Sequence, residues 1–401
     1  MRVLHTFKVY DLEREGGVQR AITALAAGEA GGAVEHDFFT LADNGPWTLQ
    51  PNADPLTVHA ARRTGRCCAT DFSVSARRRF RALAREADIV HYHLPWPFVH
   101  WLDRAVPSET PRVATYHADI CRNPLLKRLY EPMMERFLHR LDAVIATSPV
   151  YAKTSPVLQR VAPERLYVAT LGVAVRDDQG VAVDQAQADL RARLGEAFML
   201  FLGATRRYKG AAVAIEALRY TDARLVIAGE CVDRAAFTAH AGHCGVADRV
   251  VFLGRVSEAQ KWALLRLCRA LVMPSTLRSE AFGLALVEAG AAERPAITCE
   301  IGTGTSYVVR HGETGWVVPP HDAPALGAAM AQAQADPAQA AALGRAGFAR
   351  YRNCFTATAY AQRMHGVYDD LIGQGRTAPA SCTAIQPPET NGRGPRNGVN
   401  S

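Results

Sequence analysis

The chain has 401 residues, of which 48% are hydrophobic and 21% charged, and its formal net charge at pH 7 is +7. This composition is that of a globular protein long enough for two domains with full cores, and it excludes fibrous and intrinsically disordered classes. No apolar run reaches the about 18 residues that a membrane-spanning helix needs, and the first residues lack the pattern of a signal peptide.

The first half of the chain alternates short apolar runs with segments of helical periodicity, which is the pattern of an α/β protein with a parallel sheet. We expect strands at residues 3–7, 87–92, 112–116, 143–147 and 166–171, and helices at residues 18–27, 76–86 and 125–141.

The same alternation returns in the second half. Strands are expected at residues 198–203, 223–228, 250–253, 271–273, 296–298 and 315–318, with helices at 211–218, 257–268, 283–292, 339–349 and 357–371. The polar, weakly patterned stretch 173–188 is interpreted as a linker, and 374–401 is expected to be disordered because it has almost no large apolar residues. The predicted organisation is therefore two doubly wound α/β domains, 1–176 and 177–356, followed by a helix at 357–373 and a tail at 374–401.

Two facing doubly wound domains predict a ligand in the crevice at the carboxyl ends of their strands. Two glutamates, Glu280 and Glu288, bracket a strand-to-helix turn that opens on Gly283. Backbone N–H groups at such a helix start suit an anion, and carboxylates on both sides suit hydroxyl groups. A nucleotide diphosphate-sugar has that layout, with ribose, diphosphate and hexose in a row.

Arginines are concentrated between Arg62 and Arg85, where eight of them accompany one acid, Asp71. Such a patch is either a solvated helix face or a surface for anionic lipid headgroups or a phosphate-bearing acceptor. Nucleic acid is the weaker interpretation, because no nucleic-acid-binding motif accompanies the arginines. The nine cysteines have no metal or redox spacing, which favours free thiols in a cytoplasmic protein.

The ordered motifs resemble those of retaining glycosyltransferases of family 4, with the GT-B architecture, and in particular the bacterial mannosyl- and rhamnosyltransferases of O-antigen or exopolysaccharide synthesis. The resemblance runs from Met1 to about Leu371. It is carried by seven segments: Gly16-Gly-Val-Gln19, Asp88-Ile-Val-His-Tyr-His-Leu-Pro95, Thr115-Tyr-His-Ala-Asp119, Tyr208-Lys-Gly210, Ser279-Glu-Ala-Phe-Gly-Leu-Ala-Leu-Val-Glu288, Glu300-Ile-Gly-Thr-Gly-Thr-Ser306 and His311-Gly-Glu-Thr-Gly315.

The resemblance implies roles for the donor site in the second domain. Glu280 would contact hydroxyls of the donor hexose and Glu288 the ribose, while the N–H groups of Phe282, Gly283 and Leu284 would bind diphosphate. Lys209 would neutralise the leaving diphosphate. The family usually places an arginine where this chain has Ala204, so Arg206 is expected to substitute for it.

The first domain would supply the opposite wall of that site. The Gly16-Gly17 pair after the first strand lets the backbone approach a ligand and tolerates positive φ, and Gln19 could cap the following helix. His117, at the end of its strand, would line the sugar subsite. His91 and His93 share a strand face by alternation, but no third ligand is evident from the sequence, so no metal is expected.

The expected activity is transfer of a hexose, with mannose from GDP-mannose favoured, to a lipid-linked oligosaccharide acceptor, with retention of configuration and without a metal or other cofactor. The protein would work in the cytoplasm or at the inner face of the membrane, with the 62–85 segment near the lipid. Two alternatives remain: an epimerase of the same architecture acting on a sugar nucleotide, and a non-catalytic subunit that binds a nucleotide-sugar, for which the Ala204 departure is the best support.

Overall fold

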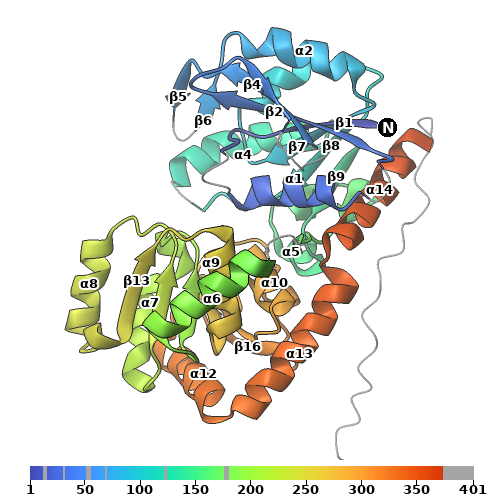
Figure 1. Ribbon diagram of the computed structural model, residues 1–401. Helices are drawn as coiled ribbons and strands as arrows, with labels where there is room; N and C mark the ends of the chain where they lie inside the picture. Colours follow the sequence, from blue (N-terminus) through green and yellow to red (C-terminus); the bar gives the residue numbers. More distant parts are fainter. Residues whose placement is uncertain are drawn as a thin grey trace, which may run out of the picture.

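The computed structural model describes residues 1–11, 16–29, 32–50, 56–67, 70–121, 124–175 and 180–373. Figure 1 shows two α/β lobes, one above the other, with the last helix running along one side of both. The prediction for 374–401 falls outside the described residues. In the described part, no helix combines the length and apolar character that crossing a bilayer requires.

The upper lobe is built on an eight-stranded sheet in the order β10-β9-β8-β7-β1-β2-β4-β3, parallel except where β3 pairs antiparallel with β4. A separate antiparallel pair, β5 and β6, lies outside this sheet. The strands of the lobe are β1 (Arg2–Thr6), β2 (Glu35–Ala42), β3 (Trp47–Leu49), β4 (Leu56–Arg62), β5 (Gly65–Cys67), β6 (Thr70–Phe72), β7 (Ile89–Leu94), β8 (Arg112–Tyr116), β9 (Ala143–Ala146) and β10 (Leu166–Val168). Its helices are α1 (Gly17–Ala27), α2 (Ala76–Glu86), α3 (Val99–Leu102), α4 (Pro124–Leu138) and α5 (Pro149–Thr154).

Strands β2 and β4 were not expected from the sequence. Both carry buried or half-buried polar side chains that hide the apolar pattern. Asp37 of β2 accepts hydrogen bonds from the Arg2 guanidinium at 2.5 Å and pairs with the ring of His59 at 2.7 Å. Because these partners satisfy the carboxylate, the strand tolerates a charge that its sequence pattern would place at a surface.

The lower lobe contains a six-stranded parallel sheet in the order β13-β12-β11-β14-β15-β16. Its strands are β11 (Met199–Leu202), β12 (Leu225–Ala228), β13 (Val250–Gly254), β14 (Ala270–Met273), β15 (Ala296–Cys299) and β16 (Gly315–Val318). Its helices are α6 (Gly180–Leu194), α7 (Ala211–Ala217), α8 (Arg234–His243), α9 (Glu258–Leu267), α10 (Leu284–Ala291), α11 (Thr305–Val308), α12 (Ala323–Ala335) and α13 (Pro337–Cys354).

The interpretation of 173–188 as a linker is wrong for its second part, because residues 180–188 belong to α6. This helix buries only three side chains, Val183, Leu190 and Leu194, and packs against α9. Three apolar residues spread over 15 positions leave the sequence polar on average, although they line one side of the helix.

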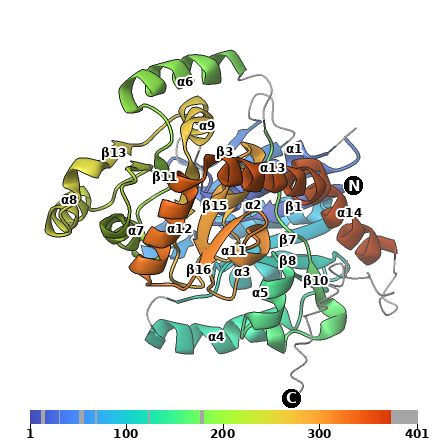
Figure 2. The same cartoon turned by 90° about the horizontal axis from the view of Figure 1, so that it is seen from below.

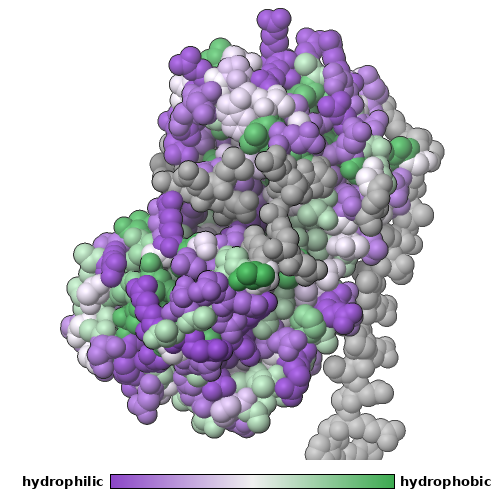
Figure 3. Space-filling view, viewed as in Figure 1, coloured by the Kyte–Doolittle hydropathy of each residue, from purple (hydrophilic) through white to green (hydrophobic). Residues whose placement is uncertain are grey.

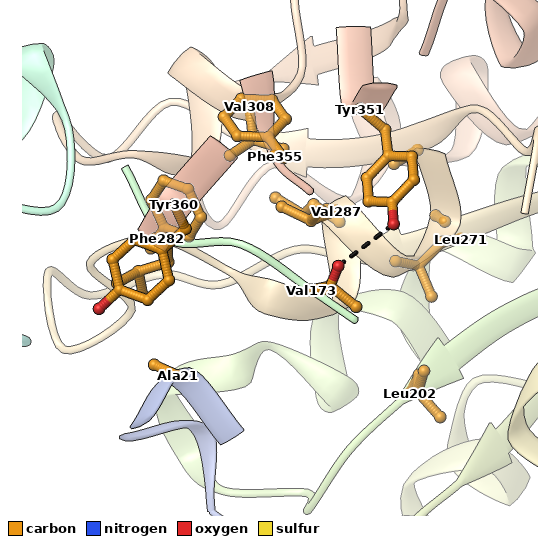
Figure 4. Close-up of a cluster of buried hydrophobic side chains, with 14 of the residues drawn as sticks. Ala21, Val173, Leu202, Leu271, Phe282, Val287, Val308, Tyr351, Phe355 and Tyr360 are labelled. Atoms are coloured by element: carbon orange, nitrogen blue, oxygen red, sulfur yellow. Dashed lines mark hydrogen bonds between the residues drawn. The ribbon is translucent and has the colours of Figure 1, made fainter. Parts of the chain in front are cut away.

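The last helix, α14 (Ala357–Gly373), returns to the upper lobe and lies beside α1 (Figures 1 and 2). The approach is close: a Cβ on Gly28 would lie 2.2 Å from the carbonyl oxygen of Ala357, and one on Gly172 would lie 2.4 Å from that of Thr356. One apolar cluster therefore joins residues of both lobes (Figure 4), and Tyr351 donates its hydroxyl to the Val173 carbonyl inside it at 3.2 Å.

Each sheet changes the direction of its strand order once, between β7 and β1 in the upper sheet and between β11 and β14 in the lower one. Parallel sheets bind ligands beyond the carboxyl ends of their strands at such points. The loops after β1, β8, β11 and β14, together with the first residues of α1 and α10, therefore form the place to look for the functional site, and they contain all the candidate residues except Glu288.

Candidate active site

Lys209 and Glu280 lie at the switch point of the lower sheet. Lys209 belongs to the loop after β11 and Glu280 to the loop after β14, and the Lys209 Nζ is 3.3 Å from Glu280 Oε2. A Cβ on Gly203, which ends β11 at a φ of +122°, would lie 3.4 Å from that Nζ, so the ammonium rests over the end of the strand. The charge of Glu280 raises the pKa of Lys209, although burial opposes this. The two side chains therefore form a largely buried ion pair.

The loop that carries Glu280 is shaped by Gly283, the N-cap of α10. Its φ of +84° is the left-handed conformation that glycine adopts without strain, and a Cβ there would lie 2.6 Å from Met273 Cε. No side chain caps α10, so the first N–H groups of the helix, at Leu284 and Ala285, point out of its start without an intrahelical partner. Thr303 donates its hydroxyl to the carbonyl of Glu280 at 2.8 Å, which fixes the loop from below.

Phe282, expected among the donor-binding residues, has its side chain in the core, 4% exposed and 5.9 Å from the Phe355 ring centroid. Only its backbone remains available to a ligand. The loop 300–306 contributes the Thr303 support, and its Gly302 carbonyl accepts from the Thr154 hydroxyl of the upper lobe.

Glu288 lies one helix turn deeper, on α10, and is 3% exposed. Its Oε1 accepts from the Lys261 ammonium at 2.6 Å and from the Arg20 guanidinium at 3.1 Å. Burial would raise the pKa of Glu288, but the charges of Lys261 and Arg20 outweigh it and lower that pKa, so the group is an anion at neutral pH. Arg20 stands on α1 and also pairs with Glu258 at 2.9 Å, so this network spans the two lobes.

Gly16 and Gly17 lie at the start of α1 and are exposed, and a Cβ on either would meet nothing within 4 Å. Gly16 has a φ of −81°, and neither residue is among those with positive φ, so the tolerance of glycine for positive φ is not used here. What the pair provides is open space in front of the helix start. Gln19 does not cap α1; it binds the backbone N–H and C=O of Asp11 at 2.9 and 3.0 Å.

His117 follows β8, and its Nε2 lies 2.8 Å from Nδ1 of His93. Burial lowers the pKa of His117 to about 3, so the ring is neutral. His93 in turn contacts His5, a residue that no sequence motif indicated. Ring nitrogens of His5, His91 and His93 come within 4.8 Å of one another, so a third potential ligand does accompany His91 and His93.

Each of these three rings already uses both nitrogens in hydrogen bonds. His91 contacts the Tyr368 hydroxyl at 2.7 Å and the Thr115 hydroxyl at 2.8 Å, His5 lies between His93 and His36, and His93 between His5 and His117. The rings are thus arranged as hydrogen-bonded pairs rather than turned toward a common point.

Two further cations lie near the Lys209–Glu280 pair. Burial is the largest cause that lowers the pKa of Lys8, and the positive charge of Arg206 lowers it further. The same charge opposes the rise in the pKa of Lys209 that Glu280 causes. Lys8 follows β1 in the upper lobe, whereas Arg206 is an exposed residue of the lower one. Cations from both lobes therefore influence one another beside the loop after β11, and Lys8 was missed because its place depends on how the lobes face each other.

Arg278 makes the second contact between the lobes. Its guanidinium donates to Asp119 Oδ2 at 2.8 Å, to the Gly302 carbonyl at 2.7 Å and to the Thr154 hydroxyl at 3.1 Å. Asp119 is held from the other side by Ser155 at 2.7 Å. Since Asp119 follows His117 by two residues, this ion pair positions the end of β8 against the loop that carries Glu280.

Two parallel α/β lobes with charged loops meeting at their switch points define the class of two-domain GT-B glycosyltransferases. The sequence matches two family patterns: Glycosyltransferase Family 4 over residues 15–176 and Glycosyl transferases group 1 over residues 183–350. The chain belongs to this glycosyltransferase family.

Among the relatives, D-rhamnosyltransferase WbpZ of Pseudomonas aeruginosa is 42% identical over 89% of this chain and 93% of its own length. O-antigen chain mannosyltransferase C of Escherichia coli is 34% identical over 93% of this chain and 99% of its own. Among solved structures, sucrose-phosphate synthase of Thermosynechococcus elongatus superposes with a TM-score of 0.72 at 23% identity, covering 93% of this chain and 99% of its own. That similarity establishes the shared fold.

Proposed function

We propose that this glycosyltransferase moves a manno-configured hexose, either mannose or its 6-deoxy form, from a GDP-linked donor to a lipid-linked O-antigen type saccharide. The names of the relatives in Pseudomonas aeruginosa and Escherichia coli support the sugar class, because D-rhamnose is 6-deoxymannose. The observation that carries the proposal is the Lys209–Glu280 pair, 3.3 Å apart beside the uncapped start of α10.

This arrangement offers one group for each part of the donor. The N–H groups at the start of α10 and the ammonium of Lys209 bind the diphosphate. The N-terminus of a helix and a nearby cation both stabilise negative charge on phosphate oxygens. Glu280 accepts from hydroxyls of the hexose. Glu288 has one oxygen shared by Lys261 and Arg20, and its second oxygen accepts from the ribose hydroxyls.

Lys8 and Arg206 support a leaving diphosphate that needs no metal. The charge of Arg206 acts on both Lys8 and Lys209, and in this proposal Lys8 and Arg206 take the place of the arginine that the family usually has at position 204. In the proposed retaining reaction the acceptor hydroxyl attacks the anomeric carbon on the face from which the diphosphate departs. The bond from that carbon to the phosphate oxygen breaks, and the departing phosphate oxygen takes the hydroxyl proton. Full activity after treatment with EDTA, and an unchanged anomeric configuration in the NMR spectrum of the product, are the expected results.

A binding and transfer experiment tests the proposal. GDP-mannose and GDP-D-rhamnose should raise the thermal midpoint of the protein, whereas UDP- and dTDP-sugars should not, because a ligand that binds only the folded state stabilises it. Glu280→Gln should lower kcat by about 10²–10³, the usual cost of losing one preorganised electrostatic contact. Glu313→Gln, an exposed carboxylate in the same lobe, is the matched control. A thermal shift with UDP-sugars alone, or full activity of Glu280→Gln, would contradict the proposal.

A further inference from the structure

A row of four histidines runs through the upper sheet from the candidate site toward the far side of the lobe. His117 Nε2 is 2.8 Å from His93 Nδ1, His93 Nε2 is 3.1 Å from His5 Nδ1, and His5 Nε2 is 2.9 Å from His36 Nδ1. The residues follow or stand on β8, β7, β1 and β2, which are neighbours in that order in the sheet. Adjacent strands thus place the four rings side by side on one face.

The row ends on Glu29, in the turn after α1. His36 Nε2 lies 3.4 Å from Glu29 Oε1, and His365 of α14 contacts the same oxygen with its Nε2. The Glu29 side chain is 2% exposed and that of His365 is 26% exposed. The histidine row therefore connects the sugar side of the candidate site with the crossover helix, and none of the roles assigned to the site uses it.

Three of the four rings, those of His5, His93 and His117, are neutral. Burial lowers the pKa of His5 and His93 well below 6.5, and that of His117 to about 3. Burial would raise the pKa of Glu29. The hydrogen bond from His36 and the charge of His365 outweigh burial and lower this pKa, so Glu29 is ionised. A neutral imidazole has one N–H donor and one acceptor nitrogen, whereas a carboxylate only accepts.

The direction of every hydrogen bond in the row follows from this count. With a single proton on its ring, His36 donates from Nε2 to Glu29, and its Nδ1 then accepts from Nε2 of His5. His5 then accepts from Nε2 of His93, and His93 accepts from Nε2 of His117. His117 is left with an unprotonated Nδ1, for which the described residues offer no hydrogen-bond partner.

We propose that Glu29 is a positioning residue that acts through His36, His5 and His93 to hold His117 in the Nε2–H tautomer. The unprotonated Nδ1 of His117 then accepts a hydrogen bond from a hydroxyl of the donor sugar. The role of the sugar hydroxyl rests on the proposed function, whereas the tautomer is a property of the free protein. A second proton on His36 would reverse each bond in the row and turn Nδ1 of His117 into a donor.

The tautomer can be measured directly on the full chain labelled with ¹⁵N-histidine. Long-range ¹H–¹⁵N correlation spectra at pH 7.5 should show the Nε2–H form for His117, identified as the signal lost in His117→Gln. This measurement needs no substrate and no variant of the other row residues, so its result is valid whether or not the donor sugar is correctly assigned. An Nδ1–H form in the native protein would overturn the proposal, and so would one bound metal ion per chain, because His5, His91 and His93 would then be ligands.

Variants test whether Glu29 exerts the control. Glu29→Gln should produce a mixture of His117 tautomers, because an amide can either donate or accept. His36→Phe should do the same with the carboxylate still present, since it breaks the row. Tyr368→Phe is the matched control: it removes a buried hydroxyl from His91, beside the row, and should leave His117 unchanged. The same spectrum from all three variants would overturn the proposal.

Binding separates the role of the row from general damage. Glu29→Gln should raise the KM for GDP-mannose roughly tenfold, because the hydrogen bond between His117 and the donor sugar is lost. It should leave the Kd for GDP alone unchanged, because GDP lacks the sugar that His117 would contact. Equal weakening of both ligands would show a distorted site and refute the positioning role. No binding of either ligand to the native protein would refute the proposed function and leave the tautomer result intact.

Discussion

The Arg20 guanidinium donates to Glu288 across the boundary between the lobes, with Nη1 and Oε1 3.1 Å apart. Arg20 stands on the first helix of the chain and Glu288 on a helix of the second lobe, yet the same carboxylate oxygen also accepts from Lys261 at 2.6 Å. The glutamate expected to hold the ribose is thus anchored by charges from both halves. With the proposed ribose role of Glu288, nucleotide binding would be coupled to the relative position of the lobes through this carboxylate.

Glu288→Gln should both destabilise the protein and weaken its binding of GDP. Removing one partner of a buried pair leaves Lys261, which is 5% exposed, with an uncompensated charge. We expect a loss of about 3 kcal/mol in the free energy of unfolding. This loss is at the lower end of the range for breaking a buried ion pair, because Glu258 still contacts the Lys261 ammonium at 2.6 Å. Urea denaturation and calorimetric titration with GDP measure the two effects.

Glu258→Gln is the matched control, since it contacts the same lysine and arginine but its side chain is 45% exposed. Its loss should stay below about 1 kcal/mol, as for other surface pairs. The double variant Lys261→Met with Glu288→Leu should regain stability without regaining GDP affinity. Restored GDP binding in that double variant would disprove a role for Glu288 in the ribose subsite.

Lys8→Gln should reduce kcat and the affinity for GDP by about tenfold, because its ammonium supplies part of the charge that stabilises the diphosphate. Arg207→Gln changes the same net charge at an exposed neighbour of Arg206 and should have little effect. Steady-state kinetics with GDP-mannose compares the two variants. Equal, small effects for both would indicate that only the overall charge of this region matters.

Stability should fall as the pH drops below about 6.5. His5, His91 and His93 have pKa values lowered well below 6.5 by burial, and His117 has one of about 3. The unfolded chain takes up protons below its ordinary histidine pKa, whereas the folded chain does not, so the stability present above pH 6.5 is lost on acidification. Each histidine contributes up to about 1.4 kcal/mol per pH unit. Urea titrations at pH 7 and 5 measure this slope; His139→Gln, an exposed position, should not alter it.

The arginines of α2 should bind anionic membranes. Ala76, Phe80 and Ala84 face the core, whereas Arg78, Arg81 and Arg85 are exposed at the top of the upper lobe, where Figure 3 shows a hydrophilic surface. Others in the segment are already engaged: Arg66 pairs with Asp71 at 2.8 Å, and Arg79 donates to Thr48 at 2.6 Å. The free surface is thus narrower than the sequence predicts.

Changing Arg78, Arg81 and Arg85 together to Glu should abolish sedimentation with phosphatidylglycerol vesicles and leave transfer to a soluble acceptor unchanged. A triple change to Glu at the exposed Arg193, Arg219 and Arg352 of the lower lobe is the charge-matched control. If both variants lose vesicle binding equally, net charge rather than α2 is responsible.

The sequence was enough to predict two doubly wound sheets and to assign Lys209 and Glu280 to one donor site, because both residues lie in loops that follow strands of the second sheet. It was insufficient for contacts that depend on strand order. His5 and His93 are 88 residues apart and touch only because β1 and β7 are neighbours. Helix α6 was not predicted because it buries few residues, and strands β2 and β4 were not predicted because polar residues interrupt their apolar pattern. Lys8, Arg20 and Arg278 act between lobes, whose relative placement no local pattern encodes.

The return of α14 to the first lobe has a consequence for biosynthesis. Tyr360, Met364 and Tyr368 share a core with Val3 and Ile89, so the first sheet leaves the ribosome long before the helix that covers it is made. At translation rates of about 5–20 residues per second, the delay is on the order of tens of seconds. During that time the nascent chain exposes apolar surface, and a product ending before Ala357 would never cover it. Chaperone demand during translation is therefore built into the order of the chain.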